Sequence, residues 1–337
     1  MNKTLFGDVE LRKPFPRFSW FFGRLVMLAA VWCLASGTAL AIENDSDIEN
    51  GKRGGCTSTA AAALKACQHE VTDNYWIAIG NCNNVSDRNA RAECQQQTKT
   101  ARTAGEEQCG VQFEARLKIC GSLGEAPYDP KIDPAKFVDP AKIGKTVAPN
   151  PYFPLVRGRT WKYKGGTESS TVTVTEATRK ILGVTCATIR DVVKNNGQVI
   201  EDTKDWYAQD IYGNVWYFGE IAQKIEDGEL VSIDGSWVAG VDRAKAGIIM
   251  KLTSKVSEVY RQEFSLGNAE DMAEVLSLTG SATVPATSCS GNCLITKEFL
   301  PFDPGATSHK YYARGIGFIL EAAPETGERV LELIEVK

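Results

Sequence analysis

Histidine is scarce in this chain, with two residues among 337, and the motifs of several common enzymes are missing. A Ser-His-Asp hydrolase could use only His309, and no G-x-S-x-G segment presents a nucleophilic serine. Neither a phosphate-binding loop nor the EF-hand calcium pattern occurs. The chain therefore lacks the commonest sequence signatures of serine hydrolases, nucleotide-binding proteins and EF-hand calcium sites. We therefore expect no catalytic residue, no cofactor and no metal.

Positive charge is also in short supply. The chain carries 38 Lys and Arg residues against 42 Asp and Glu residues, and its net charge is −4. Lys and Arg are not gathered into a basic patch of the kind that neutralises phosphates. We therefore expect no nucleic-acid partner.

One long apolar run occurs, from Leu25 to Leu34, and no second one follows. A basic segment precedes the run, and Ala39-Leu40-Ala41 follows it as an A-x-A cleavage pattern. We predict that residues 1–41 are a cleaved signal peptide; its five basic and two acidic residues leave a mature chain of charge −7. The alternative is an uncleaved anchor, because the charge-free run is just long enough to span a bilayer. The expected location is the periplasm or the extracellular space, with no transmembrane span after cleavage.

Cysteine, by contrast, is abundant, with ten residues in all and nine after the predicted cleavage site. In an exported chain this density indicates disulfides formed in an oxidising compartment. The first six of the nine follow one another in palindromic steps of 11, 15, 12, 15 and 11. They are Cys56, Cys67, Cys82, Cys94, Cys109 and Cys120. The outermost, middle and innermost positions each sum to 176, as two antiparallel segments paired in one register would require.

The segments around these cysteines favour helices. Steps of 11 and 15 lie near whole turns of an α-helix, so each cysteine returns to the same face. Residues 60–64 are strong helix formers, residues 90–109 have few β-branched side chains, and Ser86 or Asp87 is the expected N-cap of the second helix. We predict that residues 56–121, after a flexible N-terminus at 42–55, form a hairpin bridged 56–120, 67–109 and 82–94. Metal binding by these thiols is the alternative, but no C-x₂-C spacing occurs.

A Pro-rich segment follows, which we assign to residues 122–158. Seven prolines lie from Gly121 to Pro154, and the sequences IDPAK and VDPAK repeat within it. Because each proline disfavours helix at the preceding residue, the segment is expected to be extended. It is either a spacer between two domains or a strap packed on the second domain through residues such as Phe137 and Tyr152.

Residues 159–337 have the alternation of β-strands. The sequence STVTVTE at 170–176 alternates apolar and polar residues, and Asn196-Gly197 is a strong hairpin turn signal. We expect about ten strands in a meander that forms a curled sheet, half-barrel or barrel. Residues 267–280 fit either a helix or a strand. The predicted fold class is α+β, with a stapled helical hairpin, a Pro-rich linker or strap and a C-terminal antiparallel β domain.

Three segments of the β domain carry a resemblance: NPYFPLVRGRTWKY, DWYAQDIYGNVWYFGE and HKYYARGIGFILE. They look like segments of uncharacterised secreted bacterial proteins. The last is also similar, more distantly, to the half-barrels of LolA-type lipoprotein carriers. That second resemblance implies a curved antiparallel sheet with an apolar concave face and a lipid-like ligand. The chain departs from that type by carrying the hairpin and by lacking an obvious lid helix.

One group of acidic and aromatic residues invites a functional interpretation. The acids are Glu201, Asp202, Asp205, Asp210 and Glu220, and the aromatics are Trp206, Tyr207, Trp216 and Tyr217. Carboxylates among aromatics suit carbohydrate binding or acid–base hydrolysis. We favour the simpler alternative, in which the aromatics form the core of a hairpin and the acids face water. The four aromatics remain the tentative ligand-binding residues.

Three cysteines remain outside the palindrome, namely Cys186, Cys289 and Cys293. Cys289 and Cys293 can close a small loop and leave Cys186 as a buried thiol, or one of them can bridge to Cys186. A site built from Cys289, Cys293 and His309 is the metal-binding alternative. Taken together, the sequence predicts an exported, non-catalytic binding protein for an unknown protein or a small apolar or lipid-like ligand. The alternative is a carboxylate-dependent hydrolase that acts on carbohydrate.

Overall fold

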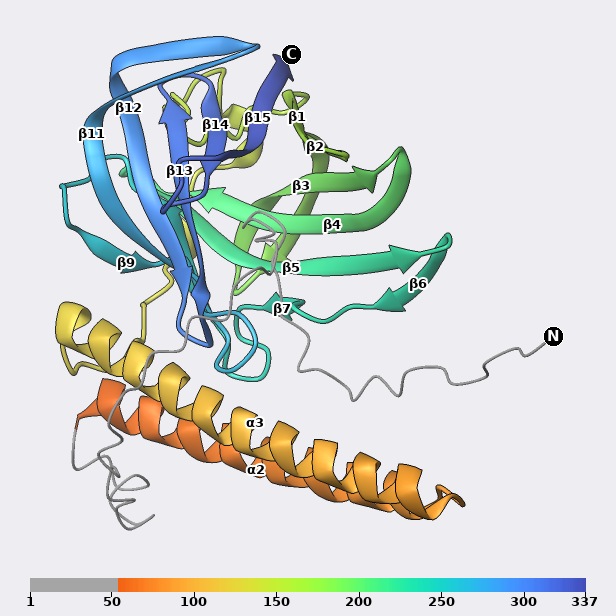
Figure 1. Ribbon diagram of the computed structural model, residues 1–337. Helices are drawn as coiled ribbons and strands as arrows, with labels where there is room; N and C mark the ends of the chain where they lie inside the picture. Colours follow the sequence, from red (N-terminus) through yellow and green to blue (C-terminus); the bar gives the residue numbers. More distant parts are fainter. Residues whose placement is uncertain (1–53) are drawn as a thin grey trace.

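The structure is a computed structural model that describes residues 54–337 (Figure 1). The predicted signal peptide and residues 42–53 of the predicted flexible segment lie outside the described residues. Two long helices come first, α2 (Gly55–Asn83) and α3 (Arg88–Leu123). Of the two N-cap candidates, the structure uses Asp87, whose carboxylate accepts a hydrogen bond from the backbone N–H of Ala90 at 2.8 Å.

Three disulfides join the two helices in the predicted pairing. They link Cys56 to Cys120, Cys67 to Cys109 and Cys82 to Cys94. The Cα atoms of the paired cysteines lie 5.6, 5.7 and 5.7 Å apart, so the two helices approach closely along their whole length. The predicted hairpin and its three bridges are therefore confirmed.

Val71 of α2 packs closely against Gly105 of α3 between two of the disulfides. A Cβ atom added to Gly105 would lie 2.9 Å from Cγ2 of Val71, whereas one added to Gly110 would meet no atom within 4 Å. Gly105 is therefore the small residue that the disulfide spacing requires at this level of the hairpin.

These two glycines allow a matched test of the packing. We expect Gly110→Ala to stabilise the helix by about 0.5–1 kcal/mol, because alanine loses less backbone entropy than glycine. Gly105→Ala should show none of this gain, because its methyl group displaces Val71. Thermal unfolding of the oxidised protein, followed by circular dichroism, measures both changes. Equal stabilisation by the two substitutions would contradict the close contact.

The strands of residues 54–337 form one antiparallel sheet. Its strands are β1 (Thr160–Gly165), β2 (Glu168–Ile181), β3 (Val184–Asn195), β4 (Gln198–Gln209), β5 (Val215–Glu226), β6 (Glu229–Ser232), β7 (Trp237–Val238), β8 (Lys245–Met250), β9 (Val259–Arg261), β10 (Glu263–Phe264), β11 (Met272–Val284), β12 (Thr287–Leu300), β13 (Asp303–Ala313), β14 (Gly317–Ala322) and β15 (Arg329–Val336). Residues 54–337 thus contain 15 strands where we expected about ten, and the surplus consists of pieces of two to four residues.

The sheet is curled but not closed. Its strand order is β10-β8-β5-β4-β3-β2-β1-β15-β14-β13-β12-β11-β9, with β6 and β7 paired to β5. The two end strands, β9 and β10, are consecutive in the chain and are separated by Gln262 alone. One short segment therefore forms both edges of the sheet, and the two halves face each other across an interior (Figure 1).

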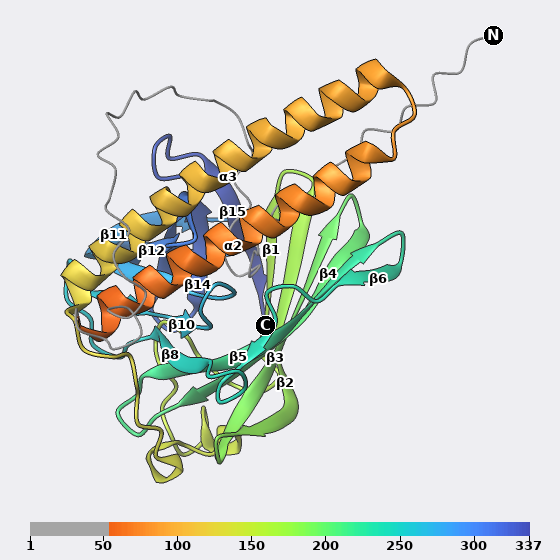
Figure 2. The same ribbon diagram turned by 90° about the horizontal axis from the view of Figure 1, so that it is seen from below.

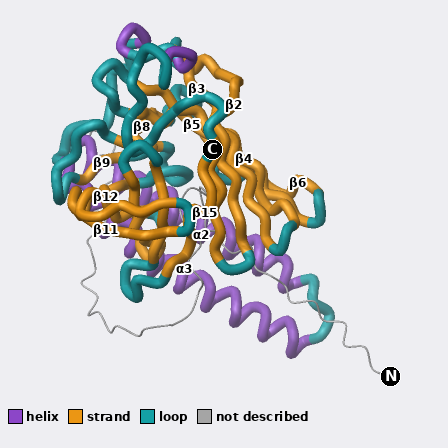
Figure 3. The backbone as a smooth tube through the Cα atoms, turned by 90° about the horizontal axis from the view of Figure 1, so that it is seen from above, coloured by secondary structure: helices purple, strands orange, loops and turns teal. Residues whose placement is uncertain are grey.

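The Pro-rich segment is a strap, not a spacer. Ile143, Phe153 and Leu155 are part of the hydrophobic core, and the ring of Phe137 packs edge-on against Phe218 at 5.5 Å. The two DPAK repeats each form a single 3-10 turn, η1 (Pro134–Lys136) and η2 (Pro140–Lys142), with the preceding aspartate as N-cap. These turns lie on the opposite side of the β domain from the hairpin (Figure 3). The strap interpretation is therefore confirmed.

The two open questions of secondary structure have clear answers. Residues 272–284 are strand β11, paired to β12 and β9, so the helical interpretation of 267–280 is wrong. Hydrogen bonds to β12 and β9 on either side stabilise the extended conformation of these residues. At Asn196-Gly197 the φ angles are 49° and 83°, as the predicted hairpin turn requires.

The hairpin lies across the lower side of the β domain, and its tip stands clear of the sheet (Figure 2). The beginning of the strap contacts the base of the hairpin, and α3 joins the hairpin to the β domain. Glu125 accepts hydrogen bonds from the backbone N–H and the hydroxyl of Thr57 at 3.0 and 2.6 Å. Further along, Arg116 of α3 forms a buried ion pair with Glu270 of the β domain. The hairpin base is therefore joined to the loop before β11, and α3 also contacts β9 and β13.

Candidate ligand-binding site

Most of the acids around Trp206 are buried, so our expectation that they face water is wrong. Glu201 and Asp205 point to the same face of β4, and the exposed fractions of these two residues are 0% and 1%. Glu220 lies directly opposite Asp205 on β5 and is equally buried. Asp191 on β3 is buried as well. Strand alternation predicts that 201 and 205 share a face, but only the curl of the sheet makes that face an interior.

Burial sets the protonation of these carboxyl groups. Desolvation raises the pKa of Asp191 to about 7 and that of Glu201 to about 9, because an ion is poorly solvated in the interior. It also raises the pKa values of Asp205 and Glu220; Asp191 raises that of Asp205 further, and Asp205 raises that of Glu220 further. The hydroxyl of Tyr217 donates to Asp205 at 2.6 Å. Glu201 and Glu220 are therefore neutral hydrogen-bonding groups at neutral pH, whereas Asp191 and Asp205 change their protonation near it.

A buried cation lies on the opposite half of the interior. Lys310 of β13 forms an ion pair with Glu298 of β12 at 3.1 Å, and the two side chains are almost wholly buried. Lys310 also lowers the pKa of Asp191, although β13 and β3 are far apart in the strand order. The two groups can interact only because the sheet curls back on itself.

The four aromatic residues that we singled out from the sequence belong to the core and to a turn. Tyr207 and Tyr217 are fully buried and stack with ring centroids 4.4 Å apart. Trp206 is buried beneath the guanidinium of Arg179, which lies 3.9 Å from the centroid of its ring. The indole N–H of Trp216 donates to Asp210 at 3.0 Å.

The two remaining acids of that group have structural partners. Asp210 accepts hydrogen bonds from the backbone N–H groups of Tyr212 and Asn214, so it organises the turn between β4 and β5. Asp202 forms a two-point ion pair with Arg190 on the other face of β4. Neither carboxylate faces the other acids.

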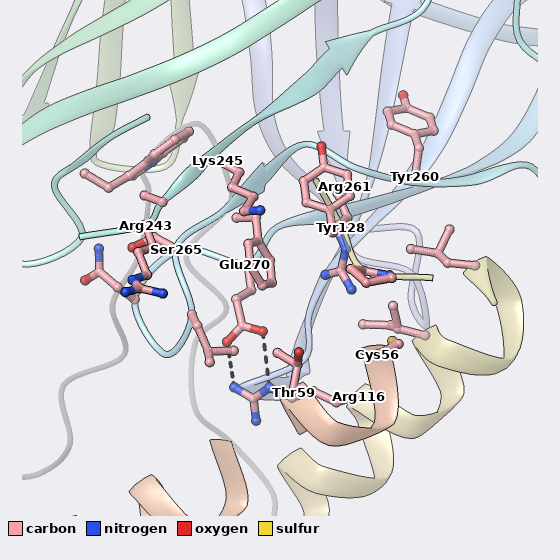
Figure 4. A pocket seen from close by; sticks show the side chains of 18 of the residues that line it. Cys56, Thr59, Arg116, Tyr128, Arg243, Lys245, Tyr260, Arg261, Ser265 and Glu270 are labelled. Carbon is pink, nitrogen blue, oxygen red and sulfur yellow. Dashed lines mark hydrogen bonds and ion pairs between the residues drawn. The ribbon is translucent and has the colours of Figure 1, made fainter. Parts of the chain in front are cut away.

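A large cavity lies between the base of the hairpin and the β domain (Figure 4). Its volume is about 1140 Å³, and its lining contains no member of the four aromatics discussed above. The hairpin contributes Thr59, Arg116 and Leu123, the strap contributes Tyr128, and the β domain contributes Trp237 and Arg261 among others. A cavity of this size can enclose a ligand of drug-like or larger dimensions.

The wall of the cavity combines apolar surface with charge. Aromatic and aliphatic groups predominate, including Trp237, Phe264 and Leu123. Val241 and Leu266 are exposed residues of the lining, so the cavity is reached from solvent. Many ligand sites share this composition, in which apolar groups supply most of the contact area and a few polar groups fix the orientation of the ligand.

The ion pair between Arg116 and Glu270 joins the two sides of the cavity (Figure 4). Two guanidinium nitrogens donate to the two carboxylate oxygens at 2.7 and 3.2 Å. Glu270 also accepts the backbone N–H of Gly267 at 2.8 Å. The pair therefore connects α3 to the loop before β11 and keeps the hairpin base against the β domain.

The remaining cysteines are accounted for without a metal. Cys289 and Cys293 form a disulfide, and Cys186 is a buried thiol whose pKa burial raises to about 12. Because both cysteines are oxidised, neither can supply a thiolate to the alternative metal site with His309. Within residues 54–337, no group of three or more His, Cys, Asp or Glu residues is arranged to hold a metal ion.

Comparison with known proteins adds no relative: no family model, curated protein or solved structure matches the chain. Among residues 54–337, no helix combines the length and the apolar character needed to cross a membrane.

The cavity was not foreseen from the sequence. Its lining comes from the hairpin, the strap, the segments 220–221, 236–245 and 259–270, and Lys251, none of which has a recognisable motif. One local signal was available, since Asp242 and Arg243 occupy a tight turn without the usual glycine. The packing of the hairpin against the β domain brings these segments together.

Proposed function

We propose that the protein is an exported, non-catalytic binding protein whose ligand occupies the cavity between the hairpin base and the β domain. The observation that carries the proposal is a solvent-reached cavity of about 1140 Å³ with a largely apolar wall. The four disulfides support an oxidising compartment, either the periplasm or the extracellular space. The largely apolar wall of the cavity favours an apolar or lipid-like ligand.

The arrangement of the carboxylates favours binding over hydrolysis of carbohydrate. A glycosidase needs two carboxyl groups that flank a substrate in a cleft, about 5–9.5 Å apart. Here Asp205 and Glu220 are neighbours on adjacent strands of one sheet face, and their side chains are buried. A carbohydrate chain could not lie between them without opening the core.

Binding of an uncharged dye to the mature protein tests the proposal. We expect N-phenyl-1-naphthylamine to bind with a stoichiometry of about one and to fluoresce more strongly in the apolar cavity. The double variant Leu123→Trp and Ala126→Trp enlarges two side chains that line the cavity and should weaken binding. Ile77→Trp is the matched control, because Ile77 is exposed on α2 outside the cavity lining.

Two results would contradict the proposal. One is the absence of saturable dye binding by the folded protein. The other is equal loss of binding in the cavity variant and in the Ile77→Trp control. Mass spectrometry of small molecules retained on natively purified protein then identifies the ligand.

A further inference from the structure

We propose that the cavity selects ligands that join an apolar body to an anionic group, and that Arg261 and Arg243 bind that group. This inference rests on the proposed function, because it assigns a ligand class to the same cavity. It starts from the cations of the lining, of which Arg116, Arg243, Lys245 and Arg261 are labelled in Figure 4. The protein as a whole is acidic, so the excess of cations over acids in the lining is a local feature and not a consequence of composition.

Arg261 forms no ion pair within residues 54–337, because Glu270, whose charge raises its pKa, is bound by Arg116. One terminal nitrogen of Arg261 donates only to Sδ of Met272, at 3.8 Å. Its guanidinium lies between two aromatic rings, 5.4 Å from the centroid of Tyr128 and 4.9 Å from that of Phe264. Its Nε atom is buried and has no hydrogen-bond partner. Burial lowers its pKa, which shows that the protein interior solvates this charge poorly. An anion in the cavity would supply the missing charge and hydrogen bond.

Arg243 stands at a position where the backbone disfavours it. Asp242 and Arg243 have φ angles of 48° and 62° in the turn between β7 and β8, and the backbone N–H of Ala244 donates to Val241 across this turn. Two successive residues with positive φ are usually Asn-Gly in such turns, because glycine adopts this conformation without strain. The turn thus carries an exposed cation that forms part of the cavity lining.

Most other charges of the lining have partners or are neutral, and the exception is the exposed carboxylate of Asp242. Arg116 pairs with Glu270, and Lys245 donates to Asp129 at 2.6 Å. Glu220 has a pKa well above the ordinary carboxyl value because it is buried, so it adds little negative charge at neutral pH. Across residues 54–337, no carboxylate lies within ion-pair distance of Arg243 or Arg261. These two arginines are therefore the lining cations that no carboxylate pairs, and they outnumber the single unpaired carboxylate, Asp242.

Three probes of equal chain length separate the head group from the apolar body: decanoate, 1-decanol and decylamine. We expect decanoate to bind about 10- to 100-fold more tightly than 1-decanol, the range that a charge-assisted hydrogen bond contributes. Arg261→Gln and Arg243→Gln should each remove much of this preference and leave 1-decanol binding within about twofold, because the apolar contacts remain. Added salt should weaken decanoate binding alone. Calorimetric titration of the mature protein measures all of these.

The controls keep the result interpretable. Arg314→Gln removes an exposed arginine that is not part of the lining, and it should leave every affinity unchanged. If Arg261→Gln fails to fold, the exposed Arg243→Gln variant still decides the question. Equal binding of the three probes, or a preference for decylamine, would overturn the anionic selectivity and leave the binding function intact. Failure of both the uncharged dye and 1-decanol to bind would overturn the proposed function itself.

Discussion

Raising the pH from about 5 to about 9 should cost the β domain several kcal/mol of its free energy of unfolding, because its buried carboxyl groups must ionise. Desolvation places the pKa of Asp191 at about 7, that of Asp271 at about 8 and that of Glu201 at about 9. In the unfolded chain these groups ionise near the ordinary values of about 4. Chemical unfolding of the mature protein at a series of pH values measures the change.

The direction follows from linkage. A group whose pKa is higher in the folded state binds a proton more tightly there, so its contribution to stability is complete below the unfolded pKa. That contribution declines as the pH rises above about 4 and is lost once the pH passes the folded value of about 7 to 9. Each unit of difference corresponds to ~1.4 kcal/mol, and several groups contribute. The protein should therefore be most stable in mildly acidic solution.

A substitution of Glu201 assigns the effect to the interior. Glu201→Gln removes the group with the highest of the three pKa values, so it should flatten the decline and stabilise the protein at pH of about 9. Glu226→Gln is the matched control, since Glu226 is exposed at the end of β5. A stability that stays constant or rises between pH 5 and 9 would mean that the interior carboxyl groups are solvated.

Replacing Arg116 by methionine should destabilise the contact between hairpin and β domain by about 3–5 kcal/mol, because Glu270 would keep a buried charge without its partner. The exposed fractions of the two side chains are 7% and 2%, so water cannot compensate. Denaturant unfolding measures the loss. Hydrogen exchange in residues 260–271 reports separately whether the hairpin has left the β domain while the rest stays folded.

A double variant and a surface pair complete this test. Arg116→Met combined with Glu270→Gln removes both charges and should recover much of the stability. Arg102→Met breaks an exposed pair with Glu106 within α3, so it should cost less than about 1 kcal/mol. An Arg116→Met protein as stable as the parent, with unchanged hydrogen exchange, would show that the buried pair does not hold the hairpin in place.

The hairpin is the part of this protein that the sequence by itself determined. The constant sum of the cysteine positions specifies one pairing out of fifteen, because a disulfide requires its two residues to lie close in one register. Local sequence also determines strands β2 to β5, through the alternation of apolar and polar residues and through the Asn196-Gly197 turn. In each case the information lies in neighbouring residues or in a fixed spacing.

The tertiary structure alone decided the rest. Whether Phe137 belongs to a spacer or a strap depends on whether another surface covers it, and the core of the β domain does. Whether Glu201 meets water depends on the curl of the whole sheet, because strand alternation assigns a face but not an interior. The cavity lined by Arg116 and Arg261 exists because the hairpin packs against the β domain. A contact between residues so far apart in the chain leaves no recognisable pattern in either segment.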